Sequence, residues 1–370
     1  MKKMICRILA VTSALLLACT SLAEEDLIIE EFTEIVSEDQ QAGSSMAPGE
    51  DELNVAEDEK SVLENAPSAE NGMTVTEDGW TLSPEGFLRG NNPGEKYMLE
   101  DPENGFWQYA SADLAITVRQ YTEEVTSGKK KRKLEYCIAD IHASEASPLT
   151  PVMTEASKKR IAGYKQVSPE TLIEKHPAVF AMSDDMYGIR FVRNFNFKGI
   201  VVRNGEILSG KTRNSKKSRP WPNLDVLALY PDGSMKTFIC DELSAEEYLS
   251  QGATQVFSFG PVLIRDGAIT EQVLDPKYYP YNEPRVAIGM VEPWHYIAIV
   301  VRGRPREQYA GVHLDWVAQK LLDHGCVEAM NLDGGETATM MFNGKVIEKG
   351  GNQLRSQGSM IVFGLQQDAE

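Results

Sequence analysis

The sequence predicts an α+β protein rich in β-strand, with a mixed sheet, several hairpins and a few packed helices in a single large domain. The main observation is a repeated pattern: a strand-like apolar segment, then Asn-Gly or Asp-Gly, then another strand-like segment. These dipeptides accept the positive φ angles of tight hairpin turns. The roughly 300 residues beyond the N-terminal region can form one domain or two, and the repetition favours one. The four dipeptides are Asn204-Gly205, Asp232-Gly233, Asp266-Gly267 and Asn343-Gly344.

The first 23 residues are typical of a signal peptide. A short basic start precedes residues 8–18, which are apolar but too few to span a membrane. Residues 21–23 offer small side chains for cleavage. Residues 16–19 also resemble a lipoprotein signal, in which Cys19 carries the lipid. We therefore expect a secreted or extracytoplasmic protein, attached to a membrane only if Cys19 is lipidated.

Residues 24–70 predict a disordered acidic tether. They carry 16 Asp or Glu and one basic residue, Lys60, so they cannot bury enough apolar surface to offset the entropic cost of ordering. Most of the formal net charge of −18 lies here. The remainder is only mildly acidic, which argues against nucleic acid as a partner and leaves anionic small substrates admissible. We divide it into an N-terminal extension, residues 71–105, and a main domain, residues 106–370.

One helix is clearly indicated between His313 and His324. Apolar residues recur there at helical spacing, and Gly325 follows as a stop. Residues 327–332 then predict a buried strand that ends at Asp333. A helix followed by a strand is a rigid support for a carboxylate at the strand's far end.

Three further elements have weaker signals. Residues 168–175 begin with Ser-Pro-Glu, and residues 244–251 begin with a serine followed three residues later by a glutamate, so both segments are predicted to be helices. The basic run Lys129–Lys133 lies between strand-like residues 116–120 and 134–141 and predicts a solvated hairpin tip.

Neither the cysteines nor the histidines show the sequence spacing of a metal site, so we expect no metal and no cofactor. Three cysteines lie beyond the signal peptide; they include no Cys-x-x-Cys and cannot all pair within one chain. Apolar surroundings favour buried, unreactive thiols. The histidines form no close pair in the sequence, and His295 has the best chance among them of contacting a ligand. These residues are Cys137, Cys240, Cys326, His142, His176, His295, His313 and His324.

The segment from Asn331 to Lys345 carries the densest group of polar residues that are suited to catalysis or ligand binding. Asp333 precedes Gly334-Gly335, where a backbone without Cβ atoms can approach a ligand closely. Glu336, Thr337 and Thr339 follow within the reach of one loop. The alternative is a tight turn whose Asp and Thr side chains bond only to its own backbone.

The segment Cys326–Lys345 resembles the signature of the phosphodiester glycosidase family. Other blocks occur in the order typical of that family, and together they extend from about Phe106 to Gly364. These blocks are Phe180–Gly188, Gly199–Glu206, Phe257–Leu263, Pro284–Gly289 and Ile299–Arg304.

The resemblance implies an exported hydrolase that cleaves the glycosidic bond of a sugar-1-phosphate diester in envelope or exopolysaccharide metabolism. Its ligand is then a carbohydrate or sugar phosphate, and no oligomeric state is implied. Arginine suits the phosphate, and a carboxylate suits the oxocarbenium character of the reacting carbon. The catalytic candidates are Asp333, Asp185 and Glu336. The candidates for substrate binding are Arg285, Arg304, Ser183, Asn331, Gly334, Gly335, Thr337 and Thr339.

The chain also departs from the pattern of the family it resembles. Ser183-Asp184 replaces an Asn-Gly, Arg302 replaces an aspartate, and Glu336 and Ala338 alter the glycine- and serine-rich loop. Arg302 either adds phosphate affinity or marks lost catalysis. The departures motivate a second hypothesis, a catalytically impaired relative that binds cell-wall glycan or phosphoglycan without hydrolysis.

Overall fold

The computed structural model describes residues 72–90, 94–127, 130–155, 166–186, 199–211, 222–303 and 308–366. All of them belong to one compact unit, Asp51–Glu370. The predicted signal peptide and acidic tether, with Cys19, lie outside the described residues, and so does Arg304. Among the described residues, no helix is long and apolar enough to cross a membrane.

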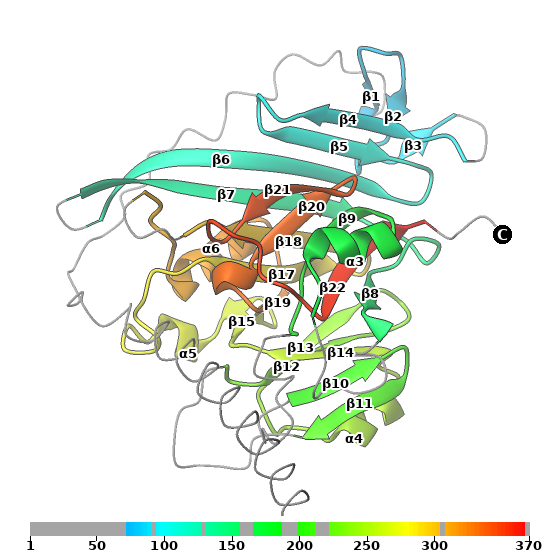
Figure 1. The fold of residues 1–370 in the computed structure, drawn as a ribbon. Coiled ribbons are helices and arrows are strands. Elements are labelled where there is room, and N and C mark those ends of the chain that lie inside the picture. Colours follow the sequence, from blue (N-terminus) through cyan, green and yellow to red (C-terminus); the bar gives the residue numbers. More distant parts are fainter. Residues whose placement is uncertain are drawn as a thin grey trace, which may run out of the picture. The chain divides into compact units, whose positions relative to one another are not determined.

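The largest sheet has nine antiparallel strands (Figure 1). Its centre is the long hairpin formed by β6 and β7, continued on one side by β18, β17 and β19. In order, the strands are β16 (Ala268–Ile269), β15 (Val262–Arg265), β19 (Glu328–Asn331), β17 (Arg285–Glu292), β18 (His295–Val301), β7 (Lys130–His142), β6 (Ala115–Ser127), β5 (Phe106–Ala110) and β4 (Tyr97–Asp101).

Three smaller antiparallel sheets complete the described fold. The first has the order β21 (Lys345–Lys349), β20 (Thr339–Phe342), β9 (Ala178–Ser183), β22 (Ser359–Leu365) and β8 (Thr150–Met153). The second has the order β11 (Glu206–Lys211), β10 (Gly199–Arg203), β14 (Gln255–Phe259), β12 (Asp225–Leu229) and β13 (Met235–Phe238). The third joins β1 (Thr74–Val75), β2 (Thr81–Leu82) and β3 (Leu88–Arg89).

The central part of the nine-stranded sheet is buried on both faces, and successive side chains of each strand point into opposite cores. On β7, Cys137 and Ala139 face a core shared with the two five-stranded sheets. Tyr136 and Ile138 face the opposite core, which helix α6 (Leu314–Asp323) covers. Both layers therefore restrain β17, β18 and β19, the strands that lead to the predicted site.

Four α-helices lie in the described residues. The sequence predicts three of them, and these are confirmed: α3 (Pro169–Lys175), α4 (Ala245–Ser250) and α6 (Leu314–Asp323). In α4, Ser244 and Glu247 form the reciprocal capping box that their spacing predicts. The fourth helix, α5 (Glu271–Leu274), was not predicted; it is one short turn.

All four predicted hairpins form, at β10–β11, β12–β13, β15–β16 and β20–β21. Asn204, Asp266 and Asn343 have positive φ, as do the glycines that follow them. In the β12–β13 turn, a Cβ at Gly233 would lie 2.3 Å from the Trp294 ring, so packing as well as conformation requires glycine there. The predicted β-rich α+β fold is confirmed.

Candidate carboxylate site

Ends of strands from all three of the larger sheets meet at one place. β9 ends at Ser183, and the next two residues are Asp184 and Asp185. β19 ends at Asn331, two residues before Asp333. The backbone N–H of Asp333 donates to the backbone oxygen of Asp184 at 3.0 Å, which joins the two loops directly. Three aspartates that lie up to about 150 positions apart in the sequence are thus brought into neighbouring loops.

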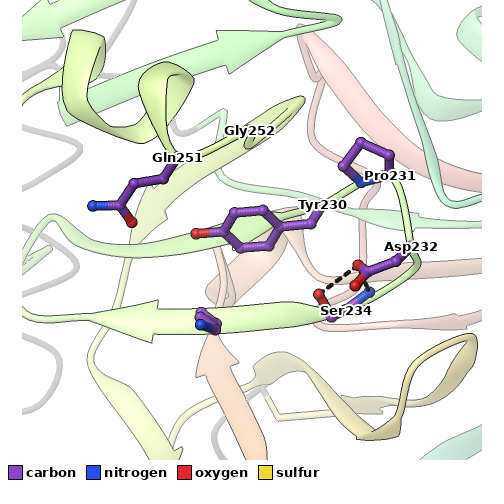
Figure 2. A pocket seen from close by; sticks show the side chains of 7 residues that line it. Tyr230, Pro231, Asp232, Ser234, Gln251 and Gly252 are labelled. Carbon is purple, nitrogen blue, oxygen red and sulfur yellow. Dashed lines mark hydrogen bonds between the residues drawn. The ribbon is translucent and has the colours of Figure 1, made fainter.

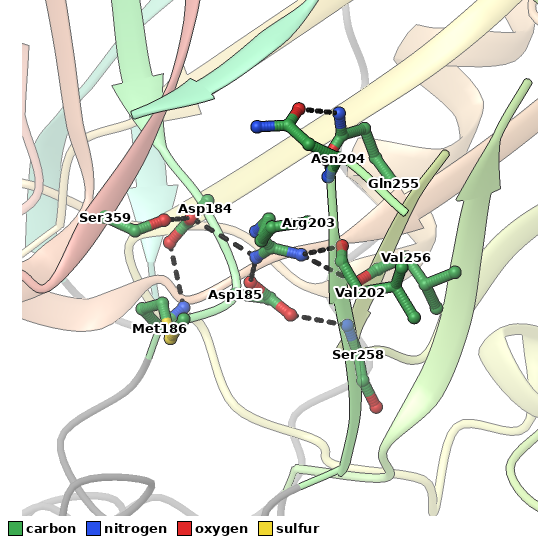
Figure 3. Close-up of polar contacts among 10 residues, drawn as sticks. All are labelled: Asp184, Asp185, Met186, Val202, Arg203, Asn204, Gln255, Val256, Ser258 and Ser359. Atoms are coloured by element: carbon green, nitrogen blue, oxygen red, sulfur yellow. Dashed lines mark hydrogen bonds and ion pairs between the residues drawn. The ribbon is translucent and has the colours of Figure 1, made fainter. Parts of the chain in front are cut away.

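Asp185 is completely buried and fully committed to neighbouring groups (Figure 3). One carboxylate oxygen lies 2.5 Å from Nη2 of Arg203, and the other accepts a hydrogen bond from the backbone N–H of Ser258 at 2.6 Å. Arg203 also donates to the backbone oxygen of Val256 and packs over the Phe257 ring. Asp185 therefore ties β9 to β10 and β14 rather than offering a free carboxylate to a ligand.

Asp184 occupies the other side of the same guanidinium. Its Oδ2 lies 3.6 Å from Nη2 of Arg203 and accepts a hydrogen bond from Ser359, while its Oδ1 accepts from the backbone N–H of Met186. Burial, followed by the like charge of Asp185, raises the pKa of the Asp184 carboxyl to about 6. A carboxyl perturbed in this way beside a charged partner is typical of functional sites.

Asp333 differs from these two aspartates in being partly exposed; Asp184 and Asp185 have 2% and 0% of their surface accessible. Extension of the β17–β19 register by two residues from the Ala287–Asn331 pair places Asp333 opposite Arg285. Of the three aspartates, Asp333 is thus the one with part of its surface accessible, although its Oδ2 atom is buried.

The two glycines after Asp333 are explained by backbone packing. A Cβ at Gly334 would lie 2.5 Å from the backbone oxygen of Pro284. Gly335 has φ of +58° and donates its N–H to that same oxygen at 3.0 Å. The pair holds the loop against the start of β17, so it fixes the position of Asp333 relative to Arg285.

The hydroxyl and amide residues of the predicted site mostly support this loop. The backbone oxygen of Thr337 accepts hydrogen bonds from the side chains of Ser183, Thr339 and Gln357, at 2.6, 2.9 and 3.0 Å. Asn331 donates to the backbone oxygens of Gly260 and Leu332. The buried side-chain atoms without a hydrogen-bond partner among the described residues include Oγ1 of Thr337 and Oδ1 of Asn331.

Arg285 lies at the start of β17 and is only 3% exposed. Its Nε and Nη2 donate to the backbone oxygens of Val312 and Tyr281, at 3.1 and 2.8 Å, and its guanidinium lies over the Tyr279 ring. These contacts orient the planar group and organise the segment around Tyr281. The predicted partner Arg304 lies outside the described residues.

Two departures from the family pattern have local explanations. Nη1 of Arg302 lies 2.5 Å from Oε1 of Glu135, and the guanidinium packs over the Tyr309 ring. The positive charge that Arg302 introduces in place of the family's aspartate is therefore paired within the protein. Glu336 is 44% exposed at its side chain and lies 3.8 Å from Arg355. It lies in the short 3₁₀ turn Gly335–Thr337, away from the contacts that join Asp184 and Asp333.

Four residues of this site escaped the sequence-based prediction: Asp184 as a perturbed acid, Arg203, Ser258 and Ser359. Arg203 carried the clearest signal, since it is a charged residue at the end of the apolar run Ile200–Val202. A charge in a buried strand requires a partner. The identity of that partner depends on which strand ends meet, which no local pattern gives.

Two hollows among the described residues lie away from this site. The larger, of about 430 Å³, lies at the β12–β13 turn, at the opposite end of β12 from Asp225. Figure 2 shows the Tyr230 ring extending across it and Asp232 bonded to Ser234. Its lining residues are Tyr230, Pro231, Asp232, Ser234, Lys236, Gln251 and Gly252.

Comparisons with known proteins place this geometry in context. A family model described as phosphodiester glycosidase (NAGPA) matches residues 177–364, just over half of the chain, and this stretch contains all the site residues discussed above. A search of curated proteins matches an uncharacterised protein derived from prophage SPbeta of Bacillus subtilis (strain 168), YomE, at 27% identity over 150 residues. That match covers 39% of this chain but only 23% of YomE, so the chain spans about a quarter of its relative.

Among solved structures, the chain is similar to the catalytic domain of zebrafish N-acetylglucosamine-1-phosphodiester alpha-N-acetylglucosaminidase, determined in a form auto-inhibited by its pro-peptide. The TM-score is 0.53 at 16% identity, and the match covers 75% of this chain and 90% of the zebrafish chain. At that identity the likeness establishes a shared fold.

Proposed function

The chain belongs to the phosphodiester glycosidase family, and on that premise we propose that it hydrolyses the bond between a sugar's anomeric carbon and the phosphate of a diester. Water adds to the anomeric carbon as the bond from that carbon to the phosphate oxygen breaks. The phosphate monoester leaves with the bonding electrons, and the proton of water passes to solvent or phosphate. The departing phosphate is a good leaving group, so strong general-acid assistance is less necessary than in an ordinary glycoside.

One observation carries the proposal: Asp333, the one partly exposed residue of the three aspartates, is held by a backbone hydrogen bond to Asp184, beside the buried Asp184–Arg203–Asp185 cluster. A negative charge fixed at that position stabilises the oxocarbenium character of the transition state, or directs the attacking water. Arg285, opposite Asp333 by extension of the strand register, is buried and donates to two backbone oxygens, so in this proposal its positive charge favours the phosphate through its electric field rather than by direct contact.

Asp184 and Asp185 have a positioning role in this mechanism. Both are almost completely buried, so neither contacts substrate directly. Arg203 lies between them and balances one of the two charges. Their hydrogen bonds to Met186, Ser258 and Ser359 keep the end of β9 in place, and the backbone of Asp184 in turn holds Asp333.

The proposed cellular setting is extracytoplasmic. A signal peptide at residues 1–23 and an acidic tether at residues 24–70 suit an enzyme that acts on phosphodiester-linked sugars of the envelope or an exopolysaccharide. The zebrafish relative is named for an N-acetylglucosamine-1-phosphodiester substrate. A diester of that sugar is therefore the first substrate to test.

The alternative is a relative that binds such a glycan without cutting it. Three of the four departures that motivate it occupy supporting positions: Ser183 bonds to the backbone of Thr337, Ala338 is buried, and Arg302 pairs with Glu135. None of them replaces Asp333. Because these three departures lie in supporting positions and Asp333 is retained, they favour hydrolysis of the diester over binding without cleavage.

Incubating the purified full chain with a methyl diester of N-acetylglucosamine 1-phosphate, and assaying free reducing sugar, separates the two functions. We expect release of reducing sugar in proportion to enzyme concentration. Saturable binding of the diester in calorimetry, without release of sugar, supports the binding protein instead.

A further inference from the structure

Two histidines that are 153 positions apart in sequence lie side by side at the ends of two inner strands of the nine-stranded sheet. His142 ends β7, His295 begins β18, and the two are direct partners in the strand register. Their rings stack with centroids 3.9 Å apart. The histidines form no close pair in the sequence, but strand register brings these two together in space.

A carboxylate completes this group. Oδ1 of Asp140 lies 2.9 Å from Nε2 of His295 and 3.5 Å from Nε2 of His142. One potential ligand atom from each of the three residues lies within 4.8 Å of the others. The two imidazoles are mostly buried, at 22% and 17% exposure, whereas the Asp140 side chain is 48% exposed. The group is therefore held by the sheet on one side and open to solvent on the other.

We propose that Asp140, His142 and His295 form a binding site for a divalent transition metal of the zinc type. Two imidazole nitrogens and one carboxylate oxygen are the donors that zinc accepts, with a water in the fourth position. Ligand atoms on a tetrahedral zinc with bonds of about 2.0–2.1 Å are separated by about 3.4 Å. The separations from Oδ1 of Asp140 to Nε2 of His295 and of His142, 2.9 and 3.5 Å, lie on either side of that value.

The two imidazole rings stack with an angle of 23° between their planes. To bind one ion, the stacked rings must turn about their Cβ–Cγ bonds, a torsion with a broad energy minimum.

This site is distinct from the carboxylate site. His295 begins β18 and Val301 ends it, and a strand of that length spans about 20 Å. The carboxylate site lies at the Val301 end, because Val301 pairs with Arg285. The metal would join the ends of β7 and β18, and so stabilise the fold rather than take part in sugar chemistry.

The test is a titration of the full chain, purified without a histidine tag, with zinc chloride in a calorimeter. The expected result is one saturable site, with affinity at least about tenfold weaker in Asp140→Asn and in His142→Asn. Asp140 is half-exposed, so its variant preserves the fold, and circular dichroism confirms this for both variants. Zinc should also raise the unfolding midpoint of wild type but not that of either variant.

His176→Asn is the matched control, since His176 lies after α3 and outside the group. We expect it to bind zinc as wild type does. Wild-type affinity in both Asp140→Asn and His142→Asn would assign any zinc binding to other groups, such as the acidic residues 24–70, and overturn the proposal. Absence of saturable binding in wild type would overturn it as well.

Discussion

At the scale of single residues, the three aspartates of the site differ in what surrounds them. Asp185 is buried between Arg203 and the backbone of Ser258, whereas Asp333 is partly exposed. One of them therefore links strands, and the other is the residue that the proposed mechanism places at the ligand. The sequence predicts Asp185 as a catalytic residue, whereas its buried contacts with Arg203 and Ser258 favour a positioning role.

Asp185→Asn tests that role. The substitution preserves shape but removes the nearer of the two carboxylates that pair with Arg203 and leaves Asp184 at 3.6 Å, which should lower the free energy of unfolding by about 2 kcal/mol. Urea denaturation monitored by circular dichroism measures this loss. Asp113→Asn, at an exposed turn, is the control and should change stability by less than about 0.5 kcal/mol. Equal stability of the two variants would show that the Arg203–Asp185 pair is not important for folding.

At the scale of elements, the local features were predictable and their assembly was not. The Asn-Gly and Asp-Gly turns require positive φ, and the capping box of α4 is complete within four residues, so short segments specify both. The contact between Asp333 and Asp184, and the pairing of His142 with His295, depend on strand order and register. Those are set by burial across three sheets, which no single segment encodes.

On β21, which packs against the nine-stranded sheet, the carboxyl of Glu348 also has a raised pKa. Glu348 is 3% exposed, and its Oε1 and Oε2 accept hydrogen bonds from the backbone of Lys349 and the side chain of Gln120. Burial raises the pKa of the Glu348 carboxyl to about 7. Because the folded state holds this proton more tightly than the unfolded state, its contribution to stability is complete below the usual pKa of 4.5 and is lost as pH rises through 7.

Glu348→Gln should therefore make stability less sensitive to pH. Between pH 4 and pH 8, wild type should lose up to about 3 kcal/mol of unfolding free energy relative to this variant. Urea titrations at several pH values measure the difference, and Glu246→Gln, an exposed residue on α4, serves as the control. A wild-type curve parallel to that of Glu348→Gln would mean that Glu348 ionises in the folded state as it does in the unfolded state.

At the scale of the whole molecule, we expect the acidic N-terminal segment to be separable from the fold. Residues 24–70 combine many like charges with few large apolar groups. Their removal should leave the melting temperature of the remaining chain unchanged in differential scanning calorimetry. A decrease of several degrees would show that the segment packs against the folded domain.

The central claim is that the chain hydrolyses a sugar-1-phosphate diester with Asp333 as the charged group at the reacting carbon. The most direct test is the turnover number of Asp333→Asn compared with wild type and with Asp113→Asn. Loss of one fixed negative charge at the transition state costs on the order of 3 kcal/mol, so turnover should fall by about two orders of magnitude or more, with folding nearly unaffected. Turnover of Asp333→Asn equal to that of wild type would contradict the account.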